Sequence, residues 1–135
     1  MRHLLLGVLV GLVGCGTVDQ FARDAVDTIG ASRTYSATWD TDASALRGQS
    51  GRFAFTCPAN PRGRDQYVWG SNPYTDDSSV CQAAVHAGAI TYASGGRVVV
   101  ETRPGQDRYT GSRRNGVETL DYGSWGDSFY VVVTR

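Results

Sequence analysis

The few residues of this chain that could perform acid–base or nucleophilic chemistry lie close together in the sequence. Ser79 and His86 are seven residues apart, so they would share one face of a helix, and Asp76 or Asp77 comes just before them. These three residue types could form the Ser/His/Asp set of a small hydrolase. Ser79 also fits the N-cap of a helix, however, and a hydroxyl that accepts a cap bond is poorly placed as a nucleophile. We therefore expect no enzyme and a hydrogen-bonded core role for His86. The alternatives are contact between His86 and a ligand, and a hydrolase that uses Ser79 and His86.

Other sets of catalytic or metal-binding residues are missing from the sequence. Cys81 and His86 would point about 140° apart on a helix, so they do not form a Cys–His pair. The adjacent Asp76-Asp77 fit the start of a helix better than a glycosidase pair. With no zinc-type Cys/His spacing and no Gly-rich phosphate loop, we expect no metal and no cofactor. Thirteen basic residues, all Arg, balance thirteen acidic ones. This neutral charge argues against nucleic-acid binding.

The N-terminus has the pattern of an export signal. A basic start is followed by the apolar run Leu4–Val13, which as a helix would span about 15 Å, half of a hydrocarbon core of roughly 30 Å. Leu12-Val13-Gly14-Cys15 then resembles the bacterial lipobox, which implies cleavage before Cys15 and acylation of that cysteine. The alternatives are an ordinary secreted protein with a chance cysteine and an uncleaved anchor. We predict a protein of the cell envelope that is held at a membrane through its lipid.

Three segments follow from this reading: residues 1–14 are the cleaved signal peptide, 15–36 are the lipidated N-terminus and tether, and 37–135 are the folded domain. The tether has apolar residues at helical spacing, so we expect either a short helix or a partly ordered spacer there. Beyond it, apolar alternation, β-branched runs and turn residues predict strands. These predicted strands are 52–57, 67–69, 97–102 with a stop at Pro104-Gly105, 117–120 after the turn Asn115-Gly116, and 129–134.

One helix interrupts the strands, over about residues 79–87. Ser79 and Gln82 have the spacing of a capping box, and Asp76-Asp77 lie near the positive end of the helix dipole. Gly88 is the expected left-handed stop. The helix is small or apolar on nearly all sides, so it should be buried. The sequence therefore predicts an α+β fold in which antiparallel strands wrap a short central helix.

The segment from Tyr74 to Ile90 resembles the signature of the LCCL domain family, and supporting motifs extend the resemblance over residues 37–135. The resemblance implies two antiparallel β-sheets around the helix. It also implies an extracytoplasmic binding module, with lipopolysaccharide or other cell-surface material as ligand. The signature residues are Tyr74, Ser79, Cys81, Ala83, Ala84, His86 and Gly88.

The cysteines depart from the family pattern. Family members often carry four cysteines in two bridges, but this chain has Pro61 where many members have the partner of the helix cysteine. The two remaining domain cysteines, Cys57 and Cys81, would belong to different bridges in the family. An oxidising envelope nevertheless favours a Cys57–Cys81 disulfide, and two buried thiols are the alternative.

Surface aromatic and arginine residues are the best indication of a ligand. Trp39, Trp69, Trp125 and seven tyrosines lie mostly in or beside loops, where they could stack on sugars or cations. The alternative, which we expect for the three tryptophans, is that these rings lie in the core. Four arginines could bind phosphate or carboxylate. We therefore expect a non-enzymatic envelope lipoprotein that binds an anionic glycan, a lipopolysaccharide-like lipid headgroup or an envelope protein. A structural subunit of an envelope assembly is a further alternative. The four arginines are Arg103, Arg108, Arg113 and Arg114.

Overall fold

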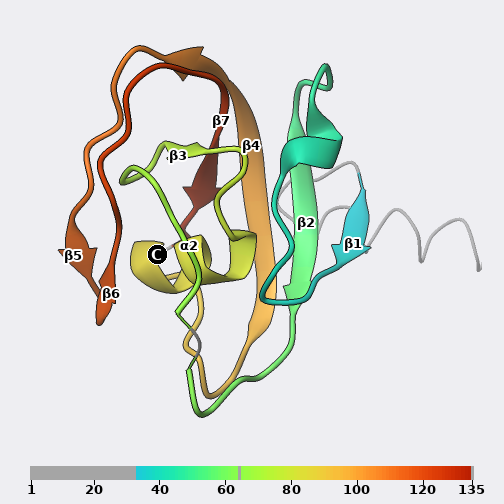
Figure 1. Ribbon diagram of the computed structural model, residues 1–135. Helices are drawn as coiled ribbons and strands as arrows, with labels where there is room; N and C mark the ends of the chain where they lie inside the picture. Colours follow the sequence, from blue (N-terminus) through green and yellow to red (C-terminus); the bar gives the residue numbers. More distant parts are fainter. Residues whose placement is uncertain (1–32, 64, 135) are drawn as a thin grey trace, which may run out of the picture.

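The computed structural model describes residues 33–63 and 65–134 of the chain (Figure 1). The predicted signal peptide, Cys15 and most of the tether lie outside the described residues. The elements, in chain order, are β1 (Thr34–Ser36), the 3₁₀ turn η1 (Ser44–Leu46), β2 (Arg52–Cys57), β3 (Tyr74–Thr75), α2 (Val80–Ala87), β4 (Gly96–Gln106), β5 (Arg113–Arg114), β6 (Val117–Glu118) and β7 (Trp125–Val132).

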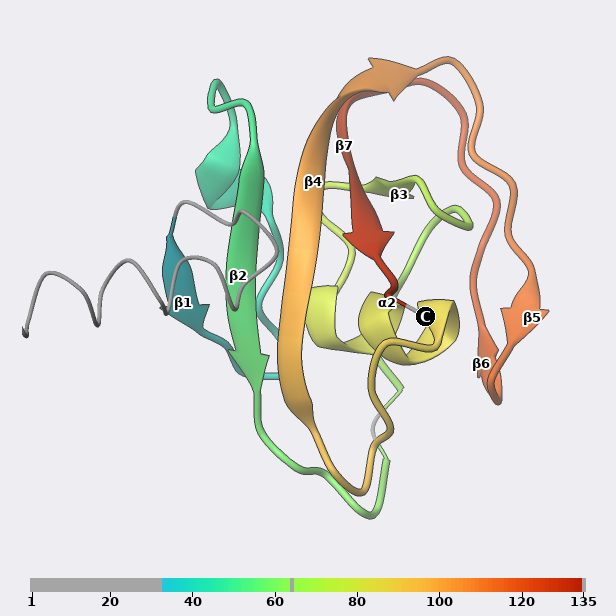
Figure 2. The same cartoon turned by 180° about the vertical axis from the view of Figure 1, so that it is seen from behind.

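The fold has three layers, with α2 in the middle. A five-stranded sheet of order β1-β2-β4-β7-β3 covers one side of the helix, and the β5-β6 hairpin covers another (Figures 1 and 2). Seven of the eight residues of the helix are buried, because protein covers both of its sides. This confirms the expected helix between two sheets, but the larger sheet is not wholly antiparallel. Strand β1 runs parallel to β2, since the chain crosses from β1 to β2 through the η1 segment instead of a tight hairpin.

The sheet begins inside the segment that the sequence assigned to the tether. Thr34, Tyr35 and Ser36 pair with Ala54, Phe55 and Thr56 of β2. The Tyr35 ring stacks on Phe55 with 5.4 Å between ring centroids. Cross-strand aromatic contact of this kind stabilises a short edge strand. Thr34–Ser36 are therefore part of the sheet.

Alternation in β2 places its larger side chains against the helix. Phe53, Phe55 and Cys57 are buried in the main core together with α2, whereas Ala54 lies on the opposite face with Val99 and Val132. Period-two alternation is what a strand requires when its two faces meet different surroundings. The predicted strand 52–57 is confirmed in both of its limits.

Strand β4 runs further than expected, through Pro104 and Gly105 to Gln106. The prediction that it stops at the proline was wrong for a topological reason. β2 pairs with β4 only as far as Glu101, although the Thr102 N–H still donates to the Gly51 carbonyl. From Arg103 on, β7 is the one strand paired with β4 among the described residues, with Pro104 opposite Asp127. A proline is tolerated where one side of the strand has no partner that needs its missing N–H.

The limits of the other predicted strands also differ from those in the structure. Residues 67–69 form no strand, and Trp69 makes only an isolated bridge to Leu120. Strand β6 ends at Glu118, and β7 covers Trp125–Val132 instead of 129–134. The turn at Asn115-Gly116 between β5 and β6 is confirmed, with both residues at positive φ (51° and 77°) as a tight hairpin turn requires.

The ends of α2 follow local rules closely. Ser79 Oγ accepts the Gln82 N–H at 3.2 Å, and Gly88 closes the helix in the left-handed conformation at φ 85°. Only half of the predicted capping box forms. The Gln82 side chain donates to the Tyr92 hydroxyl, and the Ser79 N–H donates to the Tyr67 carbonyl instead.

A disulfide joins the sheet to the helix. Cys57 ends β2 and Cys81 lies in the first turn of α2, with 5.8 Å between their Cα atoms. The Cys57–Cys81 bridge predicted from the sequence is therefore formed. Both cysteines are buried, so the bridge lies inside the core.

Candidate functional site

His86 is part of the buried core. Its Nδ1 lies 2.8 Å from the Tyr74 hydroxyl, and its Nε2 lies 3.1 Å from Ser112 Oγ and 3.3 Å from the Ser112 carbonyl. The side chain has no exposed surface. Burial lowers the pKa of His86, Arg114 lowers it further, and the Ser112 hydrogen bond opposes the shift. Both ring nitrogens are thus used to fix the helix to β3 and to the segment before β5.

Ser79 and His86 have separate partners. Ser79 Oγ donates to the Trp39 carbonyl at 2.7 Å and accepts the cap bond from Gln82. Although the two residues share a helix face, seven residues of helix separate them by about 10 Å along the axis. Asp76 points elsewhere, to Arg47 and Trp125. The structure therefore does not assemble the hydrolase set that the sequence allowed.

The four predicted ligand arginines do not form one surface. Arg103 lies on β4, pairs with Glu101 at 3.0 Å and covers the Tyr130 ring at 4.9 Å. Arg113 and Arg114 form β5, at the hairpin on the other side of α2, and Arg108 is exposed in the loop between them. Their closeness in sequence is not closeness in space. As ligand contacts they stay a prediction.

The structure instead gathers a row of four aromatic rings, which we call the aromatic strip: Tyr67, Trp69, Tyr122 and Trp125. Tyr67 stacks on Trp69 at 5.7 Å between centroids and 13° between planes. Trp69 meets Tyr122 edge-on at 6.2 Å, and Tyr122 meets Trp125 edge-on at 5.6 Å. Both tyrosines are exposed, Tyr67 at 71% and Tyr122 at 42%, and the tryptophans are half-buried. The strip is thus a series of four contacting rings that come from two distant parts of the chain.

Backbone hydrogen bonds hold these two parts together. The Leu120 N–H donates to the Val68 carbonyl, and the Gly70 N–H donates back to the Leu120 carbonyl. Gly70 is required here because its φ is 95° and a Cβ would lie 2.5 Å from the Pro73 carbonyl oxygen. The Trp69 N–H is bound by Ser78 Oγ, just ahead of α2. The strip is therefore carried by the rigid core and not by a free loop.

Buried Tyr109 supports the far end of the strip. Its backbone exchanges two hydrogen bonds with Tyr122, at 2.8 and 3.0 Å. Its hydroxyl accepts from the Gln106 N–H and donates to the Trp125 carbonyl at 3.1 Å. Tyr109 is only 2% exposed, so it lies beneath the surface. Its hydrogen bonds fix the backbone of Tyr122 and of Trp125.

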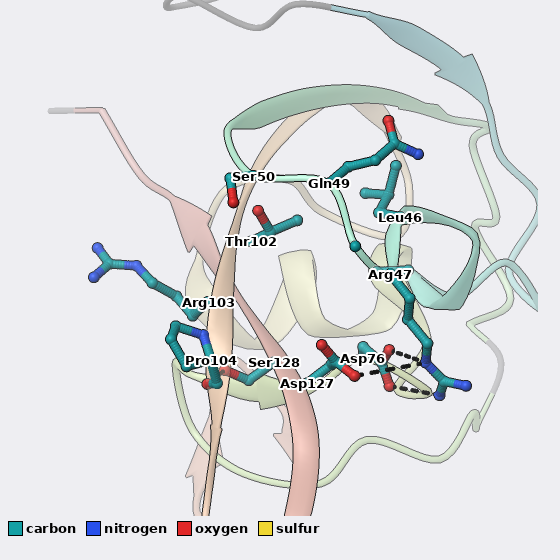
Figure 3. Close-up of a pocket in the computed structure, with 12 residues that line it drawn as sticks. Leu46, Arg47, Gln49, Ser50, Asp76, Thr102, Arg103, Pro104, Asp127 and Ser128 are labelled. Carbon is teal, nitrogen blue, oxygen red and sulfur yellow. Dashed lines mark hydrogen bonds and ion pairs between the residues drawn. The ribbon is translucent and has the colours of Figure 1, made fainter.

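A groove of about 260 Å³ lies beyond Trp125, and we call it the Arg47 groove (Figure 3). Arg47 Nε and Nη2 donate to the two oxygens of Asp76 at 2.6 and 3.0 Å, and Asp127 is 3.9 Å from Arg47. Hydrogen bonding to the Asp76 carboxylate, together with its charge, raises the pKa of Arg47. The guanidinium also covers the Trp125 ring at 5.9 Å, so Arg47 connects the groove that it lines with the last ring of the strip. In Figure 3, Arg103 extends away from this ion pair.

A second hollow of about 390 Å³ lies at the opposite end, and we call it the Tyr67 hollow. Tyr67 and half-exposed Leu120 line it, together with polar residues. These polar side chains are two carboxylates, two amides and one guanidinium. They are Asp65, Gln66, Gln82, Arg113 and Glu118.

Sequence reasoning missed the strip as a unit. Tyr67 and Trp69 are two residues apart, which puts both rings on one side of an extended chain. That spacing was a usable signal. The contact between Trp69 and Tyr122 has no such signal in the sequence, because it depends on the pairing of two segments that are about fifty residues apart.

The sequence matches the LCCL domain over residues 33–129. It belongs to the LCCL domain family. Human vitrin is 40% identical over 83 residues, which is 62% of this chain and 12% of vitrin. Human cysteine-rich secretory protein LCCL domain-containing 2 is 44% identical over 84 residues, 58% of this chain and 17% of that protein. Human cochlin is 37% identical over 75 residues, 56% of this chain and 14% of cochlin. The chain thus matches only a small part of each relative.

The LCCL signature residues build the domain's interior. Tyr74, Cys81 and His86 have no exposed surface, and the two signature alanines of α2 are equally buried. Gly88 is exposed but supplies the left-handed helix end. The signature residues therefore form part of the core of this fold, while the aromatic strip lies outside the signature.

Two further features bear on the site. Among residues 33–63 and 65–134, no cluster of three or more His, Cys, Asp or Glu side chains is arranged to hold a metal ion. Within the same part of the chain, no helix has the length and apolar character needed to cross a bilayer.

Proposed function

We propose that this protein is an extracytoplasmic binding module, held at a membrane of the cell envelope by lipid on Cys15, and that it presents the aromatic strip to an envelope component. The observation that carries the proposal is the strip itself. Exposed aromatic rings fixed to a rigid core are typical of binding surfaces, where they add contact area at low entropic cost. The family membership and the secretory protein among the relatives support an extracytoplasmic place.

The contacts of the core support binding rather than catalysis. The hydroxyl of Ser79 and both ring nitrogens of His86 are used in structural hydrogen bonds. The envelope component would be a glycan, a lipopolysaccharide-like lipid headgroup or a partner protein. An anionic ligand would use the arginines at Arg103, Arg108, Arg113 or Arg114.

A pull-down from solubilised envelope tests the proposal. The immobilised full-length chain is compared with a Tyr67→Ala/Tyr122→Ala variant and with a Tyr130→Ala control. Tyr130 lies on β7 with its ring over Arg103, on the face opposite buried Phe129 and Val131, so it is outside the strip. We expect retained glycan, lipid or protein that is lost from the double variant and kept by the control. Equal retention by all three proteins would contradict the proposal.

The anchor is tested separately through Cys15. The Cys15→Ser variant removes the thiol that would carry the lipid, so it should incorporate no labelled fatty acid. Labelled fatty acid should be incorporated into the native chain and into a Cys57→Ser/Cys81→Ser control. Incorporation that survives Cys15→Ser would rule out this site of lipidation.

A further inference from the structure

We propose that the ligand of the aromatic strip is a neutral glycan chain, which lies along the strip from the Tyr67 hollow to the Arg47 groove. This inference rests on the proposed binding function and assigns its ligand class. It departs from the sequence-based expectation of an anionic ligand, because the arginines invoked there do not form one surface.

The shape of the site fits an extended chain. The four rings follow one another at centroid spacings of 5.7, 6.2 and 5.6 Å, and Arg47 follows Trp125 at 5.9 Å. A hollow lies at one end of this row and a groove at the other. An elongated ligand with repeating units fits such a row, since each unit can pack against one ring or lie between two neighbouring rings.

The chemistry of the rings suits sugars. The face of an aromatic ring carries partial negative charge, and the C–H groups of a sugar ring carry partial positive charge, so the two stack. Tyr67 presents its outer face, because Trp69 covers the inner one in a nearly parallel stack. With 71% of Tyr67 exposed, its ring is the most accessible platform on the strip.

The polar groups at both ends fit hydroxyl groups. A hydroxyl donates and accepts, so it needs acceptors and donors side by side. The Tyr67 hollow offers carboxylates of Asp65 and Glu118 beside the guanidinium of Arg113. The Arg47 groove offers Asp127 beside Arg47, together with the amide of Gln49. A proline-rich peptide also docks on aromatic grooves, but it has few N–H groups to give to these carboxylates.

The charge balance of the ends disfavours an anionic chain. In the Arg47 groove the guanidinium of Arg47 is already bound through two nitrogens to Asp76, and Arg103 is paired with Glu101. In the Tyr67 hollow two carboxylates face one arginine. An anionic ligand would therefore have to compete with carboxylates for the arginines and would be repelled by the carboxylates of the hollow. A neutral ligand meets neither obstacle.

The test measures direct binding of defined probes to the full-length chain in a detergent that carries no sugar. The neutral probes are cellohexaose, chitohexaose and laminarihexaose, and the competing classes are a heparin oligosaccharide and a proline-rich peptide. Titration calorimetry gives affinity, and tryptophan fluorescence reports on Trp69 and Trp125. We expect a neutral hexasaccharide to bind, with a change in fluorescence and little dependence on salt.

Matched variants locate the binding. Tyr67→Ala and Tyr122→Ala should each weaken binding of that hexasaccharide about tenfold, while Tyr130→Ala leaves it unchanged. Both strip tyrosines are exposed, so the variants should keep the native circular dichroism spectrum. Equal weakening by Tyr130→Ala, or no weakening by either strip variant, would overturn the placement on the strip.

The remaining outcomes separate this inference from the proposed function. If no neutral hexasaccharide binds, or if only the heparin oligosaccharide or the proline-rich peptide binds, the neutral-glycan inference is wrong. Strip-dependent retention of envelope material in the pull-down would then still uphold the proposed function. If the pull-down also retains nothing that depends on the strip, both are wrong.

Discussion

The indole N–H of Trp125 donates a hydrogen bond of 2.7 Å to the Asp76 carboxylate, which is buried and also bound by Arg47. This contact links the last ring of the aromatic strip to the ion pair of the Arg47 groove. A buried carboxylate is stable only when its oxygens are satisfied, so the indole has a structural role in addition to its ring surface.

Replacing Trp125 with Phe should lower the free energy of unfolding by about 2 kcal/mol, because the buried Asp76 loses a hydrogen bond to a charged group. Urea unfolding followed by circular dichroism measures the change. Trp69→Phe is the matched control, since it makes the same replacement on the strip away from Asp76, and it should cost less. Equal losses in the two variants would show that the Asp76 bond contributes nothing.

Removing the Cys57–Cys81 disulfide should destabilise the domain by about 3.5 kcal/mol, because the bridge closes a loop across 24 positions of sequence. The Cys57→Ser/Cys81→Ser variant measures the loss in urea. Non-reducing mass spectrometry of the native chain should show the bridged mass. Reducing agent should weaken the native protein and leave the double variant unaffected. Two alkylatable thiols in the folded native domain would refute the bridge.

The stability of the domain should fall as pH drops below about 6.5. The pKa of His86 lies below its usual 6.5 in the folded state, mainly through burial, so the unfolded chain binds the proton more readily. The stability that His86 contributes is therefore complete above 6.5 and is lost as pH falls from 6.5 through the lowered pKa. The slope should approach about 1.4 kcal/mol per pH unit.

Urea unfolding at a series of pH values checks this slope, and His86→Gln provides the comparison. The variant is expected to be less stable at neutral pH but to lose the slope in this window. Tyr74 does not titrate there, since burial raises its pKa. An unchanged slope in the His86→Gln variant would assign the pH dependence to other groups.

Replacing Ser79 with Ala should cost about 1–2 kcal/mol of stability, because it removes the helix cap and the hydroxyl that satisfies the buried Trp39 carbonyl. The same residue should not react with a fluorophosphonate probe in the native protein. Labelling of native protein that disappears in a folded Ser79→Ala variant would favour the hydrolase alternative instead.

The sequence was sufficient wherever the physics is local. A helix cap is a contact between residues three positions apart, so Ser79 and Gly88 could mark the ends of α2 without a structure. The Asn115-Gly116 turn and the alternation of β2 depend on equally short spacings. The LCCL signature in turn identified the fold, because its buried residues are those that pack the helix between the two sheets.

The tertiary structure alone decided what depends on residues far apart. Asp76 looked like a helix-capping residue, yet Arg47, 29 positions earlier, supplies a charged partner that a helix end cannot match. Pro104 looked like a strand end, yet the β2–β4 pairing has already ended at Glu101, so the missing N–H of the proline does not interrupt it and the strand continues along β7. The aromatic strip is the clearest case. Its two halves meet through hydrogen bonds between Val68, Leu120 and Gly70, and no spacing along the chain encodes that pairing.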